Sequence, residues 1–144
     1  MIDELNDTGG ARRLDHKQHI LARTLAFGRR IVRMYKMLPN SAEAQVIGRQ
    51  VLRSGTSVGA HYREAIRARS KREFASKMHL GAAELEETTY WLALLVEAEI
   101  FSLAKLRLLR QEADELLRIF VASAKTAEKN LGGKLREDEE PYGP

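Results

Sequence analysis

Apolar residues recur at spacings of three and four along most of the chain, which is the period of an amphipathic α-helix. Between residues 17 and 38 they form two adjacent rows that cover nearly half of the helix circumference, and basic residues occupy the opposite side. The two rows are Ile20, Thr24, Phe27, Ile31, Met34 and Leu38, and Leu21, Leu25, Gly28, Val32 and Tyr35. This helix therefore has more apolar surface than a monomeric bundle requires.

A second helix is predicted over residues 42–69, with Ser41 as its N-cap after the turn that Pro39 begins. Gly55 and Gly59, four residues apart, would let another backbone approach closely, or they could mark a kink or break. We prefer one long helix, bent if at all. Its core row is Ile47, Val51, Ser54, Val58, Tyr62 and Ala65.

Two further helices follow. Ser70 and Glu73 match a capping box, in which the glutamate would accept from the amide of Ser70, and this predicts a helix start at Lys71. Ser102 is a plausible cap for the last helix, residues 103–130, which we expect Gly132-Gly133 to end. The third helix has a narrow seam typical of lengthwise packing, formed by Phe74, Met78, Gly81, Leu85, Thr88, Leu92 and Leu95.

Only three prolines interrupt the chain, and Ala and Leu dominate its apolar residues, so strands have little support. We predict an all-α protein in which residues 17–132 form one four-helix bundle. Residues 1–16 are expected to be a flexible N-terminus. Residues 133–144 have four acidic residues in a row and almost nothing to bury, which predicts a disordered acidic tail.

Charge is distributed unevenly. The chain has a formal net charge of +4, but residues 1–80 carry +9 and residues 81–144 carry −5, and sixteen of the 24 basic residues are arginine. A basic half rich in arginine is a candidate surface for phosphate, although ordinary salt bridging on helix surfaces is the plain alternative. The candidate phosphate-binding residues are Arg29, Arg30, Arg33, Arg49, Arg53, Arg63, Arg67, Arg69, Lys71 and Arg72.

Four of these arginines would form one ridge. If the second helix is unbroken, Arg49, Arg53, Arg63 and Arg67 fall within an arc of about 80°, because their separations nearly complete whole turns. No recognisable base-reading module accompanies the cluster. Any binding of nucleic acid should then be electrostatic, directed by shape and strongly dependent on salt.

Catalytic and metal chemistry finds little support. The chain has no cysteine, and His16 and His19 share a helix face without a carboxylate cluster at ligand spacing. The segment from Gly55 to Gly59 lacks the Lys-Ser/Thr ending of a P-loop. We expect a protein that is not an enzyme and binds no metal or cofactor. With neither a secretory signal nor a membrane-spanning run, we also expect it in the cytoplasm.

Two stretches carry a family resemblance. Residues 53–74 read RSGTSVGAHYREAIRARSKREF and residues 86–92 read EETTYWL. Together they resemble the bacterial four-helix-bundle proteins named after 23S rRNA intervening sequences, and the likeness covers about residues 18–125. The chain resembles the family variant that reads Ser-x-Gly-Ala-Asn-Tyr-Arg-Glu-Ala, and His61 stands where that variant has asparagine.

This resemblance implies an antiparallel up-and-down four-helix bundle that assembles into a homopentameric ring. It also implies a non-enzymatic role linked to nucleic acid. A related branch, the accessory protein of diversity-generating retroelements, binds a reverse transcriptase and nucleic acid. Two hypotheses follow: a ring that multiplies a basic patch into a polyvalent phosphate surface, and a protein scaffold whose arginines pair with acidic partners or with the chain's own glutamates.

Overall fold

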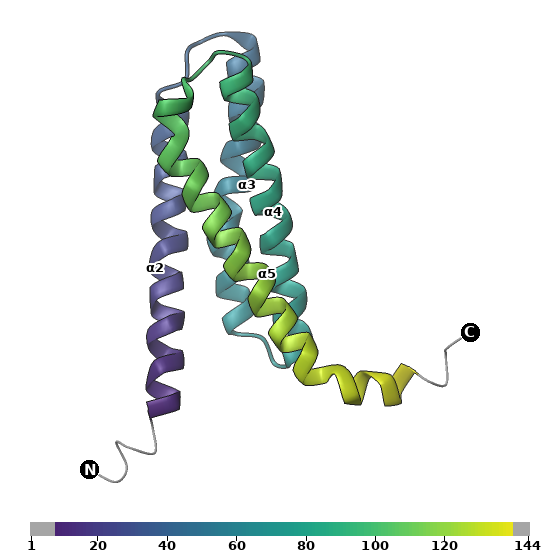
Figure 1. Ribbon diagram of the computed structural model, residues 1–144. Coiled ribbons are helices and arrows are strands. Elements are labelled where there is room, and N and C mark those ends of the chain that lie inside the picture. Colours follow the sequence, from purple (N-terminus) through teal and green to yellow (C-terminus); the bar gives the residue numbers. More distant parts are fainter. Residues whose placement is uncertain (1–7, 140–144) are drawn as a thin grey trace.

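The computed structural model describes residues 8–139, with side chains described for residues 10–131. This part of the chain consists of four α-helices, α2 (Thr8–Lys36), α3 (Ala42–Ile66), α4 (Lys71–Glu97) and α5 (Leu103–Glu139), and has no strand. The α2–α3 and α4–α5 connections lie at one end of the molecule and the α3–α4 connection at the other (Figure 1). The prediction of an all-α fold of four helices is confirmed.

Serine side chains begin three of the helices, as the sequence predicts. The Ser41 hydroxyl accepts from the Ala44 amide at 3.3 Å, and the Ser102 hydroxyl accepts from the Lys105 amide at 3.1 Å. Ser70 accepts from the Glu73 amide at 3.0 Å. The second hydrogen bond of the expected capping box has a different donor. The Glu73 carboxylate accepts from the amide of Arg69 at 3.1 Å instead of from the amide of Ser70.

The first and last helices are longer than the sequence pattern predicts. α2 begins at Thr8, nine residues before the expected start at Lys17, and α5 continues to Glu139 past Gly132-Gly133. A glycine lowers helix stability by about 1 kcal/mol but keeps its backbone N–H, so it weakens a helix without having to end it. Those parts of the predicted flexible N-terminus and acidic tail that fall in residues 1–7 and 140–144 lie outside the described residues.

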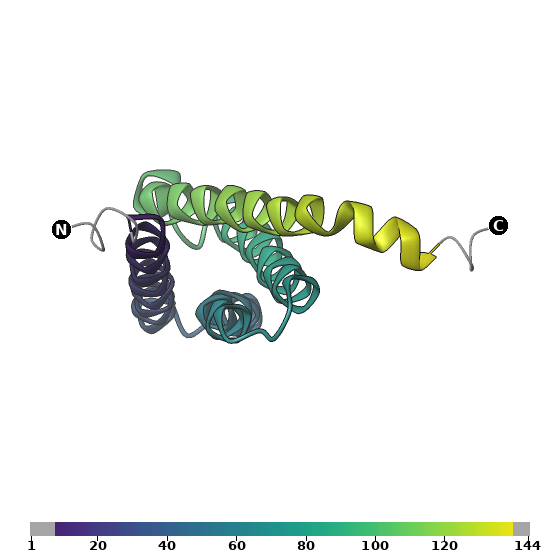
Figure 2. The ribbon, with the colours of Figure 1, turned by 90° about the horizontal axis from the view of Figure 1, so that it is seen from below.

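The core runs along α3 and α4, with α2 packed on α3 and α5 packed on α4. Seen from below, α2 stands at one side while α5 crosses the top of α4, so α2 and α5 diverge from one another (Figure 2). The predicted seam of α4 is buried except for Phe74, which is partly buried. Each large side chain that folding buries completely contributes about 1.5–3 kcal/mol. The largest fully buried ones include Phe27, Phe120, Met78, Leu85 and Leu92.

α3 is unbroken through Ser54–Gly59, which confirms the long-helix interpretation. Position 55 requires a residue without a side chain, since a Cβ there would lie 2.7 Å from Cγ1 of Ile31 on α2. Gly59 is less tight, with the nearest atom, the Thr24 hydroxyl oxygen, at 3.4 Å from the corresponding point. The glycines of α3 therefore let α2 approach closely.

Candidate nucleic-acid interface

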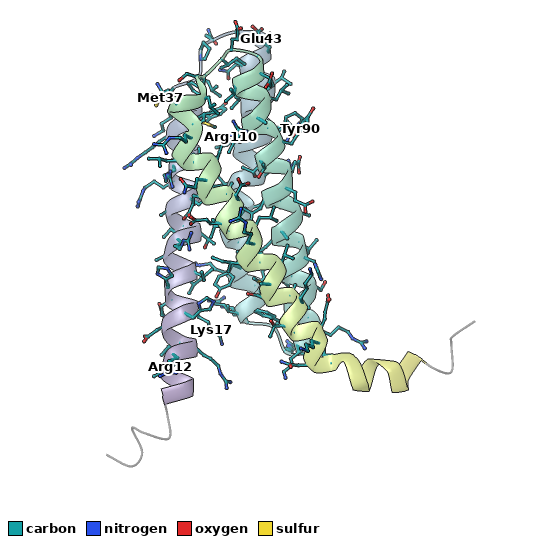
Figure 3. The ribbon with its side chains drawn as sticks, in the orientation of Figure 1. Arg12, Lys17, Met37, Glu43, Tyr90 and Arg110 are labelled. Carbon is teal, nitrogen blue, oxygen red and sulfur yellow. The ribbon has the colours of Figure 1, made fainter. Side chains whose placement is uncertain are left out.

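α2 fully buries only one of its two apolar rows, and the other row is partly buried except at Leu25. Ile20, Phe27 and Ile31 are at most 1% exposed, whereas Leu25 in the other row is 70% exposed. Met37 and Arg110 mark the upper end of the α2–α5 side of the molecule, and Arg12 and Lys17 mark the lower end of α2 (Figure 3). The structure thus confirms that this helix has more apolar surface than the single chain covers.

The uncovered row borders a groove between α2 and α3. It has a volume of about 460 Å³, and its floor is made of small or apolar residues from both helices. Arg29 of α2 and Arg63 of α3 stand at its sides. The complete lining is Thr24, Leu25, Gly28, Arg29, Val32, Thr56, Gly59, Ala60 and Arg63. An exposed apolar surface flanked by arginines is typical of a site that contacts another macromolecule.

The three candidate arginines of α2 do not form one patch. Arg29 borders the α2–α3 groove, while Arg30 and Arg33 line a separate pocket of about 260 Å³ between α2 and α5. In that second pocket they stand near Lys105 and the apolar side chains of Met37 and Phe101. The predicted basic face of this helix is therefore divided between two sides of the molecule.

The arginine ridge of α3 is present, because Arg49, Arg53, Arg63 and Arg67 are all exposed. Arg67 is the C-cap residue of α3. Arg53 leans toward α4 and Arg63 lies on the side of α2, so the ridge spans the outer surface between these two helices. α3 is unbroken over Ala42–Ile66, as the predicted ridge requires.

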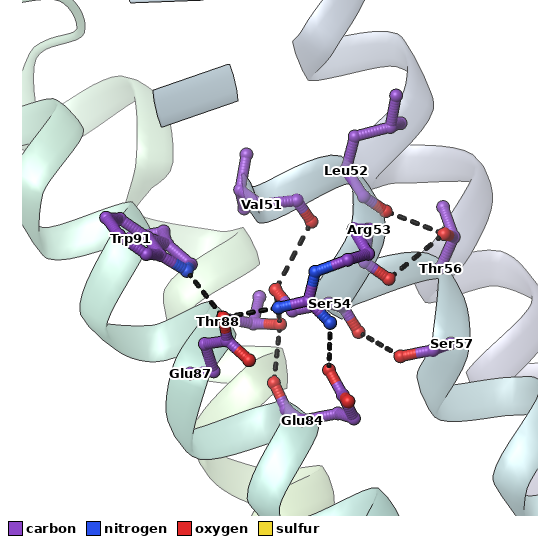
Figure 4. Close-up of polar contacts among 10 residues, drawn as sticks. All are labelled: Val51, Leu52, Arg53, Ser54, Thr56, Ser57, Glu84, Glu87, Thr88 and Trp91. Atoms are coloured by element: carbon purple, nitrogen blue, oxygen red, sulfur yellow. Dashed lines mark hydrogen bonds and ion pairs between the residues drawn. The ribbon is translucent and has the colours of Figure 1, made fainter. Parts of the chain in front are cut away.

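Arg53 differs from the others because two carboxylates hold it. It donates to Glu84 at 3.3 Å and to Glu87, and the indole N–H of Trp91 donates to the same Glu87 oxygen at 3.2 Å (Figure 4). The hydrogen bond with Glu87 raises the pKa of Arg53, and the same bond lowers the pKa of Glu87. Much of the Arg53 charge is therefore neutralised within the chain.

The remaining candidates lie around the α3–α4 turn. Arg69, Lys71 and Arg72 are exposed there, and Arg72 also lines an open pocket with His79 and Glu128, which pair with one another. Apart from Arg53, none of the ten candidates has a carboxylate partner among the described residues. Within the described part of the chain, no carboxylate therefore neutralises the other nine basic side chains.

Sequence reasoning missed basic residues near the start of α2. Arg12, Arg13 and Lys17 line a pocket with Tyr62 and Phe74, but the expectation of a loose N-terminus hid the first two. The signal that could have found Arg13 is its spacing of seven residues from Ile20, which places these two side chains on one face of a helix. Arg23, also basic and on the same helix, is held by Glu112 and Glu115 of α5.

Two further features, a metal-ligand cluster and a membrane-spanning helix, are absent from the described residues. These residues contain no group of three or more His, Asp or Glu side chains that could hold a metal ion. Within the same part of the chain, no helix has the length and apolar content to cross a bilayer. His61, which stands where the resembling family variant has asparagine, leaves its buried Nδ1 without a hydrogen-bond partner among these residues.

Comparisons with known proteins agree with this architecture. The family model described as "23S rRNA-intervening sequence protein" matches residues 16–122. A crystal structure from Bacteroides thetaiotaomicron VPI-5482, of a protein with unknown function from the S23 ribosomal protein family, is 34% identical to this chain. It superposes with a TM-score of 0.71, and the alignment covers 76% of this chain and 97% of that one. A search of curated proteins gave no match.

Proposed function

Because the chain belongs to the 23S rRNA-intervening sequence protein family, we propose that it is a non-enzymatic, homo-oligomeric protein that binds RNA or DNA through phosphate contacts. One observation carries this proposal. Nine of the ten candidate basic side chains have no carboxylate partner among the described residues, so their charge is available to an outside anion. Such binding would take place in the cytoplasm.

The expected binding mode follows from the geometry of the ridge. Arg49, Arg63 and Arg67 project from the outer side of α3 at intervals of whole helical turns. A row of this kind suits the regularly spaced phosphates of a backbone, and it offers no arrangement that reads base edges. Affinity should therefore depend on salt and shape and little on sequence.

Oligomerisation would complete the surface. The second apolar row of α2 and the groove beside it support self-association, because an exposed strip that includes Leu25 is costly to leave in water. We propose an antiparallel up-and-down bundle that assembles as a homopentameric ring; the alternation of connections between the two ends in Figure 1 supports the first part. Repetition of the arginine ridge around a ring would add avidity.

A charge-matched pair of triple variants tests the binding surface. Arg49→Ala/Arg63→Ala/Arg67→Ala removes three charges from α3, and Arg107→Ala/Arg110→Ala/Arg118→Ala removes three from α5, which lies diagonally across the molecule. Fluorescence anisotropy against structured RNA and duplex DNA should show a much larger decrease in affinity for the α3 variant. Equal decreases would mean that only net charge matters and would reject the ridge as the site.

A protein scaffold is the second candidate, and the environment of Arg53 favours it. There the arginine pairs with two carboxylates and an indole N–H completes the cluster, which shows how this surface holds acidic side chains. If the chain acts as the related retroelement branch does, the protein partner would be a reverse transcriptase. Alanine replacement of Arg63, Arg67 and Arg69 discriminates, since abolished partner binding with unchanged RNA binding favours the scaffold.

A further inference from the structure

A pocket at the lower end of α2 combines basic and aromatic side chains. It has a volume of about 280 Å³ and lies where the first turns of α2 meet the end of α3, the start of α4 and the middle of α5. Arg12 and Lys17 lie at this end of α2 in Figure 3. Arg13 and His16 line the pocket with them, and its other walls are Tyr62, Phe74 and Ser123.

Tyr62 brings a polar group to the pocket wall. Tyr62 is 4% exposed, and its ring packs at 5.8 Å from the ring of Phe120, so only a small part of it reaches the pocket. Its hydroxyl makes no hydrogen bond with another described residue and is not among their fully enclosed polar atoms, so it remains accessible to water or to a ligand in the pocket. Burial raises the pKa of Tyr62, so the hydroxyl keeps its proton and can donate as well as accept.

Two residues that line the pocket, Arg13 and His16, lie on the face of α2 that turns toward the core further along the helix. Arg13 and His16 precede Ile20 by seven and four residues, so they share the face that carries Ile20 and Phe27 into the core. A bundle would ordinarily fill these positions with apolar side chains. Here Arg13 and His16 are exposed and line the pocket, and Arg12, Arg13 and Lys17 have no carboxylate partner within the described part of the chain.

A ligand that complements both the basic and the aromatic side chains of the pocket has an anionic group and a flat ring. We propose that the pocket binds one unpaired nucleotide of a single strand, with its base against Phe74 and the Tyr62 hydroxyl and its phosphates on Arg12, Arg13 and Lys17. This assignment rests on the proposed binding of nucleic acid and specifies one site for it. Aromatic rings stack on bases of any identity, and cationic side chains beside them hold the backbone.

The size of the pocket favours single-stranded over double-stranded nucleic acid. Ligand pockets of drug-sized molecules begin at about 300 Å³, so this one accommodates roughly one nucleoside. A base inside a duplex is paired and stacked and cannot enter without being flipped out, which costs a few kcal/mol. The pocket should therefore bind single strands in preference to duplexes that have the same number of phosphates.

The test compares a short oligouridine with an RNA duplex of equal phosphate number, in anisotropy titrations of the full chain. Arg12→Ala/Arg13→Ala should lower the affinity for oligouridine by at least about tenfold, because each substitution removes a charge-assisted hydrogen bond. Tyr62→Phe should lower it about fivefold, because it removes one hydrogen bond. Both should leave duplex affinity within twofold of the wild-type value. The charge-matched control Arg107→Ala/Arg110→Ala should affect the two probes equally.

A competition measurement guards against effects on folding. Uridine monophosphate should displace oligouridine from the wild-type protein, whereas inorganic phosphate at equal ionic strength should not. If Arg12→Ala/Arg13→Ala and its control lower the affinity for both probes alike, phosphate binding stands and the nucleotide pocket is rejected. If the wild-type protein binds neither probe, the proposed function and the pocket are both rejected.

Discussion

Arg23 of α2 and Glu112 of α5 form a two-point ion pair between helices that otherwise diverge. The guanidinium Nε donates to Glu112 at 3.1 Å, a second nitrogen contacts the other carboxylate oxygen, and Glu115 lies 2.9 Å from that nitrogen. The hydrogen bond with Glu112 raises the pKa of Arg23. The pair is mostly shielded from water, so it joins the first and last helices with a fixed geometry.

A double-mutant cycle measures this connection. Arg23→Ala and Glu112→Ala should each lower the free energy of unfolding by about 1 kcal/mol, and the double variant should lose less than their sum. The coupling should fall as salt rises, because the pair is partly exposed. Urea unfolding of the four proteins gives the values. Strictly additive decreases would show that the two side chains do not stabilise the α2–α5 contact.

Two glycine-to-alanine substitutions should change the free energy of unfolding in opposite directions. Gly55→Ala places a Cβ 2.7 Å from Cγ1 of Ile31, a buried and stiff side chain, so overpacking should cost about 1–3 kcal/mol. At Gly28 the nearest atom to an added Cβ is the Thr56 Cα at 4.0 Å, so Gly28→Ala should stabilise the helix by up to about 1 kcal/mol. Thermal unfolding compares them. A stabilising Gly55→Ala would contradict the close approach of α2 and α3.

The Arg53 cluster should respond to acid. Arg53 holds the pKa of Glu87 below its ordinary value, so the stabilising contribution of this ion pair is present above that ordinary value of about 4.3 and disappears as the pH falls through the lowered pKa. Because the Trp91 indole donates to Glu87, its fluorescence should change over this acidic range. Glu87→Gln should remove the transition. An unchanged transition in that variant would assign it to another carboxylate.

Self-association should depend on the exposed row of α2. Leu25→Lys places a charge on a residue that is 70% exposed in the single chain, so its effect on monomer stability should stay within about 0.5 kcal/mol. The oligomeric mass measured by light scattering should nevertheless fall. Leu103→Lys is the control, since Leu103 is 57% exposed at the start of α5. A wild-type monomer, or equal masses for both variants, would contradict the role of this row.

Much of the fold could be predicted from the sequence because its signals are local. Serine caps mark the starts of α3, α4 and α5, and apolar spacing identified the buried face of each helix. The outer ends could not be predicted. The described side chains in the first turns of α2 are exposed, so no hydrophobic pattern marks that start, and Gly132-Gly133 favoured an end for α5 that the helix passes.

The sequence could identify the residues of the candidate site but not their contacts with neighbouring helices. Helical spacing placed Arg49, Arg53, Arg63 and Arg67 on one side of α3, and the structure has them there. Spacing within one helix carries no information about its neighbours. It could not show that glutamates of α4 hold Arg53, or that the turns of α2 bring Arg12 and Arg13 to Tyr62.

The dependence of affinity on salt tests the central claim most directly. Duplex DNA binding by the wild-type protein and by Arg49→Ala/Arg63→Ala/Arg67→Ala should be titrated over a series of salt concentrations. A protein that binds phosphates with these arginines should give a steep linear fall of log affinity with log salt, and the variant should reduce the slope by about 0.9 for each arginine–phosphate pair that it removes. No binding near 50 mM salt, where phosphate contacts are strong, or an unchanged slope in the variant, would contradict it.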